Sequence, residues 1–146
     1  MSIRNKRVLC EISRYPVLVP PAEPWDEPML VTADRLQIEI THHYPFHPPK
    51  FFMNGGNALE LLKKKYSAVL KIIRPYQFDF PCVCCRVLIS PTRWVPCMRL
   101  SDAIDDYNQW DTFLDAITNY ISFQKHFPFD DLVHAHVLTF LIPKKN

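Results

Sequence analysis

Residues 44–50 read Tyr-Pro-Phe-His-Pro-Pro-Lys, and these three prolines in seven positions constrain the fold more than any other feature. Proline has no backbone N–H to donate, so this stretch cannot lie inside a sheet. Just before it, Leu36, Ile38 and Ile40 alternate with polar residues, the pattern of a half-buried strand. Residues 51–53 can resume a short strand, so the chain is expected to turn between two neighbouring strands.

Helical periodicity is present on both sides of this region. Apolar residues recur at helical spacing in residues 4–15, which end at Pro16, and again in residues 58–73. We expect Lys63, Lys64 and Lys65 on the solvent side of the second helix. The basic side chains of the first helix are also expected mostly in solvent: Arg4, Lys6, Arg7 and Arg14.

The C-terminal third is predicted to be helical, with a separate start for each helix. Ser101 is a natural N-cap for a helix through Tyr107. A further helix is expected over residues 111–127, and a last one over residues 130–141. Residues 16–28 show no period and are expected to be loop or extended chain. This order of strands and helices predicts an α+β domain.

Composition excludes several functional classes. With 146 residues and a net charge of +2, the chain fits one domain without the basic face that nucleic acid requires. Its two glycines are adjacent, Gly55 and Gly56, which excludes phosphate-binding and dinucleotide-binding glycine loops. We expect no membrane association because the apolar runs are short. The N-terminus does not resemble a signal peptide, which predicts an intracellular protein, cytoplasmic or nuclear.

The cysteines raise the question of thiol chemistry or metal binding. They are odd in number, which argues against a disulfide scaffold: Cys10, Cys82, Cys84, Cys85 and Cys97. Cys82 and Cys85 have the spacing of half a zinc site, but no second pair follows. His134 and His136 are two residues apart on an expected helix and so point to different faces. A zinc-stapled structural protein remains one hypothesis.

Two motifs together resemble the ubiquitin-conjugating enzymes. Residues 44–50 are similar to that family's Tyr-Pro-Phe-x-Pro-Pro-Lys signature. Trp94-Val95-Pro96, with Leu100 opening a helix, resembles its Trp-x-Pro-x-x-x-(Leu/Ile) element, and a cysteine shortly precedes the tryptophan. The resemblance extends over about residues 3–110 and keeps the order and approximate spacing of the motifs.

The resemblance implies the fold of the ubiquitin-conjugating enzymes, which we call UBC-like. It is an α+β fold with an N-terminal helix, a short antiparallel meander sheet and C-terminal helices. Residues 1–126 would form this domain, with residues 58–73 as an inserted helix that the family normally lacks. Residues 127–146 would be a helical extension packed on the same domain. The region between the first helix and Leu36 is short, which leaves room for fewer meander strands than the family has.

The activity implied is transfer of ubiquitin or a ubiquitin-like protein through a cysteine thioester, without a metal or organic cofactor. Thiolates suit this reaction because they are both good nucleophiles and good leaving groups. The implied partners are the modifier, an activating enzyme and a ligase. Phe46 and Pro96 match positions where the family docks ligases, and we therefore expect Phe46 to be exposed at a loop tip next to Pro96.

Three cysteines compete for the role of nucleophile. The family places two aliphatic residues at fixed spacing after its cysteine, and from Cys85 these positions are Leu88 and Ile89. We therefore rank Cys85 first, Cys84 second and Cys82 third.

One departure puts the activity in question. The family's His-Pro-Asn tripeptide, whose asparagine is held to stabilise the oxyanion, corresponds here to residues 74–76, Arg-Pro-Tyr. The hydroxyl of Tyr76 or the amide of Gln77 would have to substitute, and Asp79 could deprotonate an incoming lysine. The alternative function is a non-catalytic UBC-like variant that binds ubiquitin or a ligase.

Overall fold

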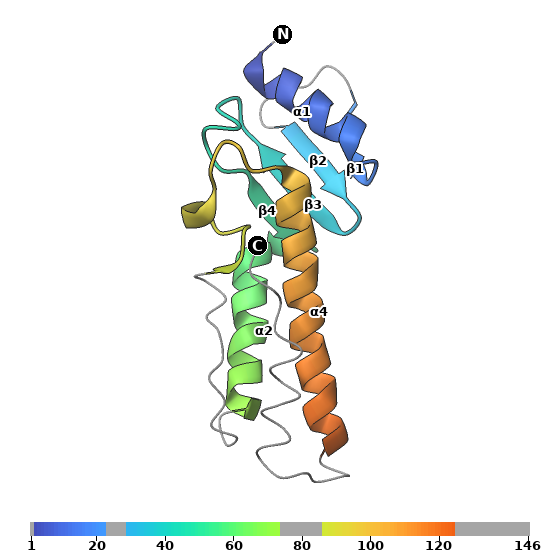
Figure 1. Cartoon of the computed structure of the whole chain (residues 1–146), viewed down its shortest axis with the longest axis vertical. Helices are drawn as coiled ribbons and strands as arrows, with labels where there is room; N and C mark the ends of the chain where they lie inside the picture. The colour runs from blue at the N-terminus through green and yellow to red at the C-terminus, as the bar shows by residue number, and fades with distance from the viewer. Residues whose placement is uncertain (1, 23–28, 74–85, 125–146) are drawn as a thin grey trace.

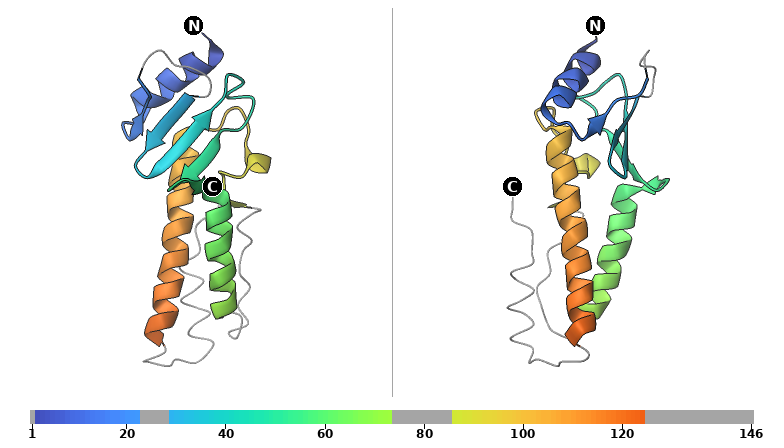
Figure 2. Two further views of the ribbon diagram at one scale, coloured as in Figure 1. Left: turned by 180° about the vertical axis from the view of Figure 1, so that it is seen from behind. Right: turned by 90° about the vertical axis from the view of Figure 1, so that its right-hand side faces the viewer.

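The structure, a computed structural model, describes residues 2–22, 29–73 and 86–124. These residues form an α+β arrangement of three α-helices and a five-stranded antiparallel sheet (Figure 1). Helix α1 lies at one end of the sheet, and the first turns of α4 lie over one of its faces. Helices α2 and α4 then run side by side beyond the sheet (Figure 2). None of the helices in the described ranges is long and apolar enough to cross a membrane.

The sheet is a meander in which each strand pairs with the next one along the chain. Its strands are β1 Leu18–Val19, β2 Met29–Ala33, β3 Leu36–Ile40, β4 Lys50–Met53 and β5 Gly56–Asn57. In the centre, Ile38 of β3 lies opposite Val31 of β2 and Phe51 of β4, and all three side chains are buried. The alternation seen in the sequence therefore turns one face of β3 into the core.

Two tight turns make the meander possible. Asn54 and Gly55 join β4 to β5 with φ angles of 51° and 81°. Positive φ at both positions of a two-residue turn matches the twist of a hairpin and favours asparagine followed by glycine. In the β2–β3 turn, Asp34 also has a positive φ, of 56°.

Side-chain caps begin the first two helices. The three helices span α1 Ile3–Arg14, α2 Ala58–Ile73 and α4 Leu100–Gln124. The Ser2 hydroxyl accepts the N–H of Asn5 at 3.1 Å, and the side-chain oxygen Oδ1 of Asn57 accepts the N–H of Glu60 at 3.1 Å. Each cap satisfies one backbone donor that the first helical turn leaves unpaired.

Lys65 joins α2 to α4. Its ammonium group lies 2.6 Å from Asp111 Oδ1 and 2.9 Å from Asp115 Oδ1. Partial burial acts to lower the pKa of Lys65, but the hydrogen bonds to the two aspartates outweigh it and the pKa is raised. Lys65 is thus an interhelical contact, whereas we expected it in solvent.

The sequence predictions are confirmed where periodicity is strong and wrong at several other places. Strand Leu36–Ile40 and helix Ala58–Ile73 occur with the expected bounds. Arg4, expected in solvent, is only 6% exposed. Ser101 is not an N-cap because α4 already begins at Leu100, and α4 continues without the expected interruption. The predicted C-terminal extension, residues 127–146, lies outside the described residues.

Candidate functional site

The predicted site residues divide into two groups. Tyr76, Asp79, Cys84 and Cys85, together with the third-ranked cysteine, lie outside the described residues. The two predicted partner-binding residues, Phe46 and Pro96, lie within them. The candidate site is therefore the surface around these two residues, together with the segment that leads to it from the cysteines.

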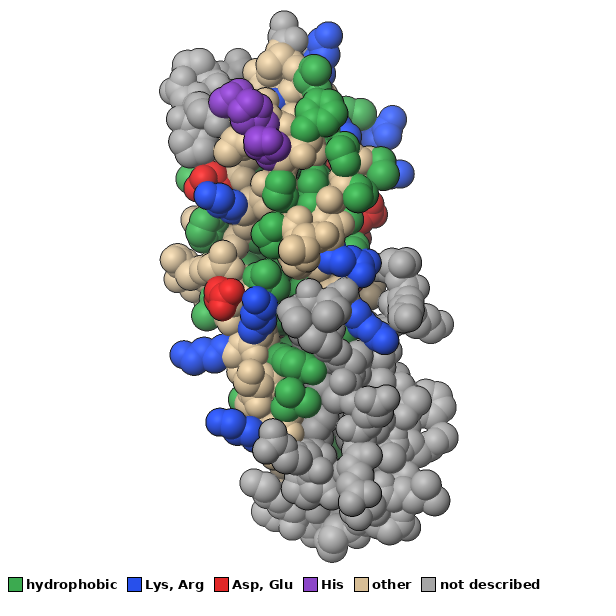
Figure 3. Space-filling view, turned by 90° about the vertical axis from the view of Figure 1, so that its left-hand side faces the viewer, with side chains coloured by type: hydrophobic (Ala, Val, Ile, Leu, Met, Phe, Trp, Pro, Cys, Tyr) green, Lys and Arg blue, Asp and Glu red, His purple; other side chains and the backbone are tan. Residues whose placement is uncertain are grey.

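The β3–β4 loop presents Phe46 to solvent. The Phe46 side chain is 63% exposed, whereas its neighbour Tyr44 is 1% exposed. The loop is folded on itself, because the Phe46 N–H donates to His43 O at 2.8 Å. Its histidines lie close together, with His42 and His43 ring centroids 3.9 Å apart, and Figure 3 shows these histidines beside hydrophobic side chains on one face. The expected exposure of Phe46 is confirmed.

Trp94 joins this loop to the segment that contains Pro96. Its indole Nε1–H donates to Pro45 O at 2.8 Å, and its ring centroid lies 5.7 Å from that of Tyr44. Val95, the next residue, is 47% exposed, and Pro96 is also exposed. We call Phe46, Val95 and Pro96 the docking surface. Its two parts are about fifty residues apart in sequence and meet through Trp94.

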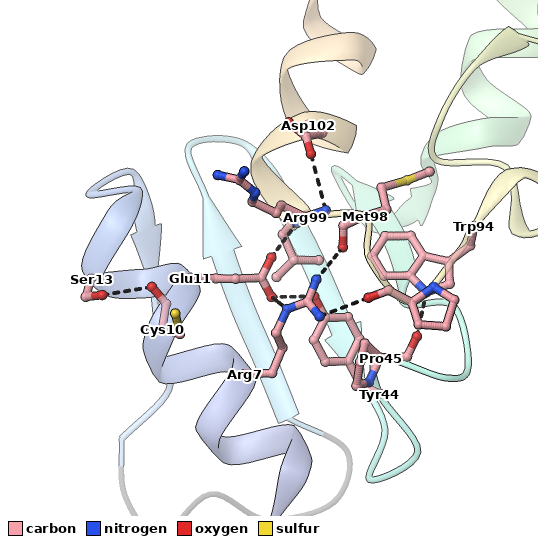
Figure 4. Close-up of polar contacts among 12 residues, drawn as sticks. Arg7, Cys10, Glu11, Ser13, Tyr44, Pro45, Trp94, Met98, Arg99 and Asp102 are labelled. Atoms are coloured by element: carbon pink, nitrogen blue, oxygen red, sulfur yellow. Dashed lines mark hydrogen bonds and ion pairs between the residues drawn. The ribbon is translucent and has the colours of Figure 1, made fainter. Parts of the chain in front are cut away.

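Arg7 of α1 holds the Pro96 segment from the other side. Its guanidinium donates to Pro96 O at 2.9 Å and to Met98 O at 2.7 Å. The same group lies 5.9 Å from the centre of the Tyr44 ring and 3.4 Å from the carboxylate of Glu11 (Figure 4). One arginine therefore fixes the backbone on both sides of Cys97.

Glu11 is the centre of this polar cluster. Its carboxylate is buried, and Oε1 accepts the N–H of Leu100 at 2.6 Å while Oε2 accepts the Tyr44 hydroxyl (Figure 4). The N-terminus of α4 favours a negative charge at this position. Burial, together with the charge and hydrogen bond of Glu11, raises the pKa of Tyr44, so its phenol stays protonated and remains the donor.

The segment that directly follows Cys85 is anchored to α4. Val87 and Ile89 are buried, and the N–H of Leu88 between them donates to Asp106 Oδ2 at 2.8 Å. Burial raises the pKa of Asp106, although the bond from Leu88 and the charge of Arg93 both act to lower it. The chain that follows Cys85 is thereby fixed within three residues of this cysteine.

Neither buried carboxylate was predicted from the sequence. Glu11 lies three residues after Val8, and Asp106 lies four residues before Trp110, so each stands on the apolar face of its helix. A charged residue at an apolar position of a helical period was the signal. Such a residue must be hydrogen-bonded when it is buried.

Metal ligation and similarity to known proteins also bear on the site. Within the described ranges, no group of three or more histidine, cysteine or acidic side chains is placed to hold a metal ion. The zinc hypothesis concerns Cys82 and Cys85, which lie outside those ranges. Comparisons of the chain with protein-family models, curated proteins and solved structures found no match.

Proposed function

We propose that this chain has a ubiquitin-conjugating-type fold and transfers ubiquitin or a ubiquitin-like protein through a cysteine thioester. The observation that carries the proposal is the hydrogen bond from Trp94 to Pro45, because it joins the two motifs on which the resemblance rests. The order of the described elements, from α1 through an antiparallel meander to the helix that opens at Leu100, supports it.

The proposed reaction has two steps, and Cys85 is its first-choice nucleophile. In the first, the Cys85 thiolate attacks the thioester carbonyl of the modifier on the activating enzyme. A new C–S bond forms, and the activating enzyme's thiolate leaves. In the second, a substrate lysine amine attacks this thioester, an amide bond forms, the Cys85 thiolate is released and the amine loses a proton.

The described residues support this chemistry by positioning. Asp106 holds the backbone of Leu88, and the buried side chains on either side of Leu88 prevent this segment from sliding. Tyr76 is proposed to donate to the oxyanion and Asp79 to accept the lysine proton. The docking surface offers an exposed aromatic ring beside a proline, a suitable anchor for a ligase. The activity is proposed in the cytoplasm or nucleus.

A charging assay tests the proposal. The chain is incubated with activating enzyme, ATP and ubiquitin, and the products are separated with and without reductant. We expect a reductant-sensitive adduct for wild type and for Cys97→Ser, which removes an exposed cysteine elsewhere. Cys85→Ser should give no adduct, or an oxygen ester that survives reductant. If serine at Cys82, Cys84 and Cys85, each alone, leaves charging normal, the catalytic proposal is wrong.

A second candidate function is a non-catalytic binding module. It is favoured by the docking surface, which is built without the cysteines, and by the absence of the family's Asn from residues 74–76. This candidate predicts no adduct, but binding to purified ligase domains or ubiquitin that Phe46→Ala weakens. Leu30→Ala is the matched control, because Leu30 is 46% exposed on β2. Equal binding by both variants would contradict a role for Phe46.

A further inference from the structure

A pocket of about 400 Å³ lies between α1 and the segment that leads into α4. Three of its lining residues are arginines, and two are cysteines. The lining includes Arg7, Arg14, Arg99, Cys10, Cys97 and Ser101. We propose that this pocket binds a phosphate monoester.

The charge of the pocket is unbalanced. Three arginines and one glutamate line it, which leaves a formal excess of two positive charges. Arg7 and Glu11 form an ion pair with each other. In the described part of the chain, neither Arg14 nor Arg99 forms an ion pair with an acidic side chain, and both residues are exposed.

The acidic side chains nearby are already engaged. Asp105 Oδ1 accepts the hydroxyl of Tyr15 at 2.9 Å, and Asp102 Oδ2 accepts the backbone N–H of Arg99 at 3.3 Å. Glu11 accepts from the Tyr44 hydroxyl and from the Leu100 N–H, and it is paired with Arg7. Neither Asp102 nor Asp105 lines the pocket, so an anion that enters it faces the arginines of the lining rather than these two carboxylates.

A phosphate monoester fits this excess better than a carboxylate. It carries about −1.5 to −2 charges at neutral pH, against one for a carboxylate. Guanidinium groups bind phosphate oxygens in a bidentate, charge-assisted manner. Ser101, in the first turn of α4, adds a hydroxyl at the positive end of that helix. The group is thus matched in charge and in donors.

The remaining volume has room for the molecule that carries the phosphate. Cys10 and Cys97 are exposed thiols on opposite walls of the pocket, one on α1 and one before α4. The carrier is either a small molecule or a phosphorylated side chain of a partner protein, and both present the same group. The inference rests on the arginines alone and holds whether or not the chain forms thioesters.

Titration of the ¹⁵N-labelled full chain at constant ionic strength tests the proposal. The probes are phenyl phosphate and a short phosphoserine peptide, with benzoate and the unphosphorylated peptide as controls. We expect saturable shifts at the amides of Cys10 and Ser101 for the phosphates only. Arg14→Gln and Arg99→Gln should each weaken binding about tenfold or more, the usual worth of a hydrogen bond to a charged group. Arg35→Gln, which removes an exposed arginine in the β2–β3 turn, should change it less than twofold.

Two further comparisons complete the test. Tighter binding of the phosphopeptide than of phenyl phosphate would identify a phosphorylated partner, and equal binding a small molecule. Saturating phosphate should also slow carbamidomethylation of Cys10 and Cys97 severalfold, as read by peptide mapping. The proposal is overturned if the shifts do not saturate, if benzoate binds equally well, or if Arg35→Gln weakens binding as much as the pocket variants.

Discussion

Replacing Glu11 with glutamine tests whether the buried carboxylate holds the site together. Both oxygens of Glu11 are acceptors, one for the Leu100 N–H and one for the Tyr44 hydroxyl. Glutamine keeps the shape but turns one of these oxygens into an NH₂ donor. With the amide oxygen toward the Leu100 N–H, the new NH₂ group faces the Tyr44 hydroxyl, which must then accept instead of donate and leaves its own hydrogen without the acceptor it had. Arg7 also loses the negative charge beside it.

The size of the effect can be worked out from these contacts. A buried donor left without an acceptor costs about 1–3 kcal/mol. Breaking a buried charge pair by removing one partner costs about 3–5 kcal/mol, but Arg7 is partly exposed and keeps the carbonyls of Pro96 and Met98. We therefore expect Glu11→Gln to lower the free energy of unfolding by about 3 kcal/mol. With a urea m-value of about 1–3 kcal/mol per molar, the midpoint falls by about 1–3 M.

Urea unfolding followed by tryptophan fluorescence measures this change, since Trp110 is buried in the core and Trp94 is partly buried against it. Glu60→Gln is the control. It removes the same charge from a side chain that is 69% exposed and paired with Lys63 only at the surface. Its effect should stay within about 0.5 kcal/mol. A midpoint for Glu11→Gln within that range would show that Glu11 does not organise the cluster.

Three further predictions concern the same contacts. Asp106→Ala should lower the free energy of unfolding by about 1–3 kcal/mol, because the Leu88 N–H loses its acceptor. Asp106→Asn should have a free energy of unfolding within about 1 kcal/mol of the wild-type value, or above it near neutral pH, since burial raises the pKa of the carboxyl. Urea midpoints compare the two variants. The raised pKa of Tyr44 means that its contribution is complete below about pH 10 and declines above it, as the unfolded chain ionises. Tyr44→Phe should show a smaller decline in the free energy of unfolding than wild type between about pH 9 and 11, while Tyr15 and Tyr107, whose pKa values are also raised, keep the rest of the decline. Trp94→Phe should cost about 1 kcal/mol by removing the hydrogen bond to Pro45, again measured in urea.

Local patterns were sufficient to predict the elements whose side-chain spacing is regular. In β3, the buried side chains are those of Leu36, Ile38 and Ile40, and their alternation with polar residues indicates a strand. In α2 the apolar residues recur every three or four positions over sixteen residues. Each pattern needs no information from the rest of the chain, so the bounds of both elements were predicted correctly.

Features that depend on pairing with other residues, rather than on a pattern of their own, were not predicted. Strand β2 follows a proline-rich stretch and begins Met29-Leu30-Val31, without alternation, so only its pairing with β3 identifies it. The start of α4 was misplaced at Ser101 because its real cap is supplied by Glu11, 89 residues earlier. The spacing of residues in the sequence gives no sign of a contact between Glu11 and Leu100.

The candidate site shows the same division. The motif of residues 44–50 and the tripeptide that begins at Trp94 were recognisable from sequence, and so was the exposure of Phe46. Their connection through Trp94 and Pro45 depends on tertiary structure. The predicted nucleophile Cys85 lies outside the described residues, as do Tyr76 and Asp79, and the roles of all three stay predictions.

The chemistry of the Glu11 cluster favours a positioning role over a stabilising one. A buried ion pair is often no more stabilising than well-packed apolar residues of the same size. What this cluster provides is geometry: Glu11 fixes the first residue of α4, Tyr44 fixes the loop that carries Phe46, and Arg7 fixes the carbonyl of Pro96. These three attachments hold both halves of the docking surface relative to one helix. A partner that contacts Phe46 and Pro96 together therefore meets a surface that is already arranged, and loses less conformational entropy on binding than two independent loops would require.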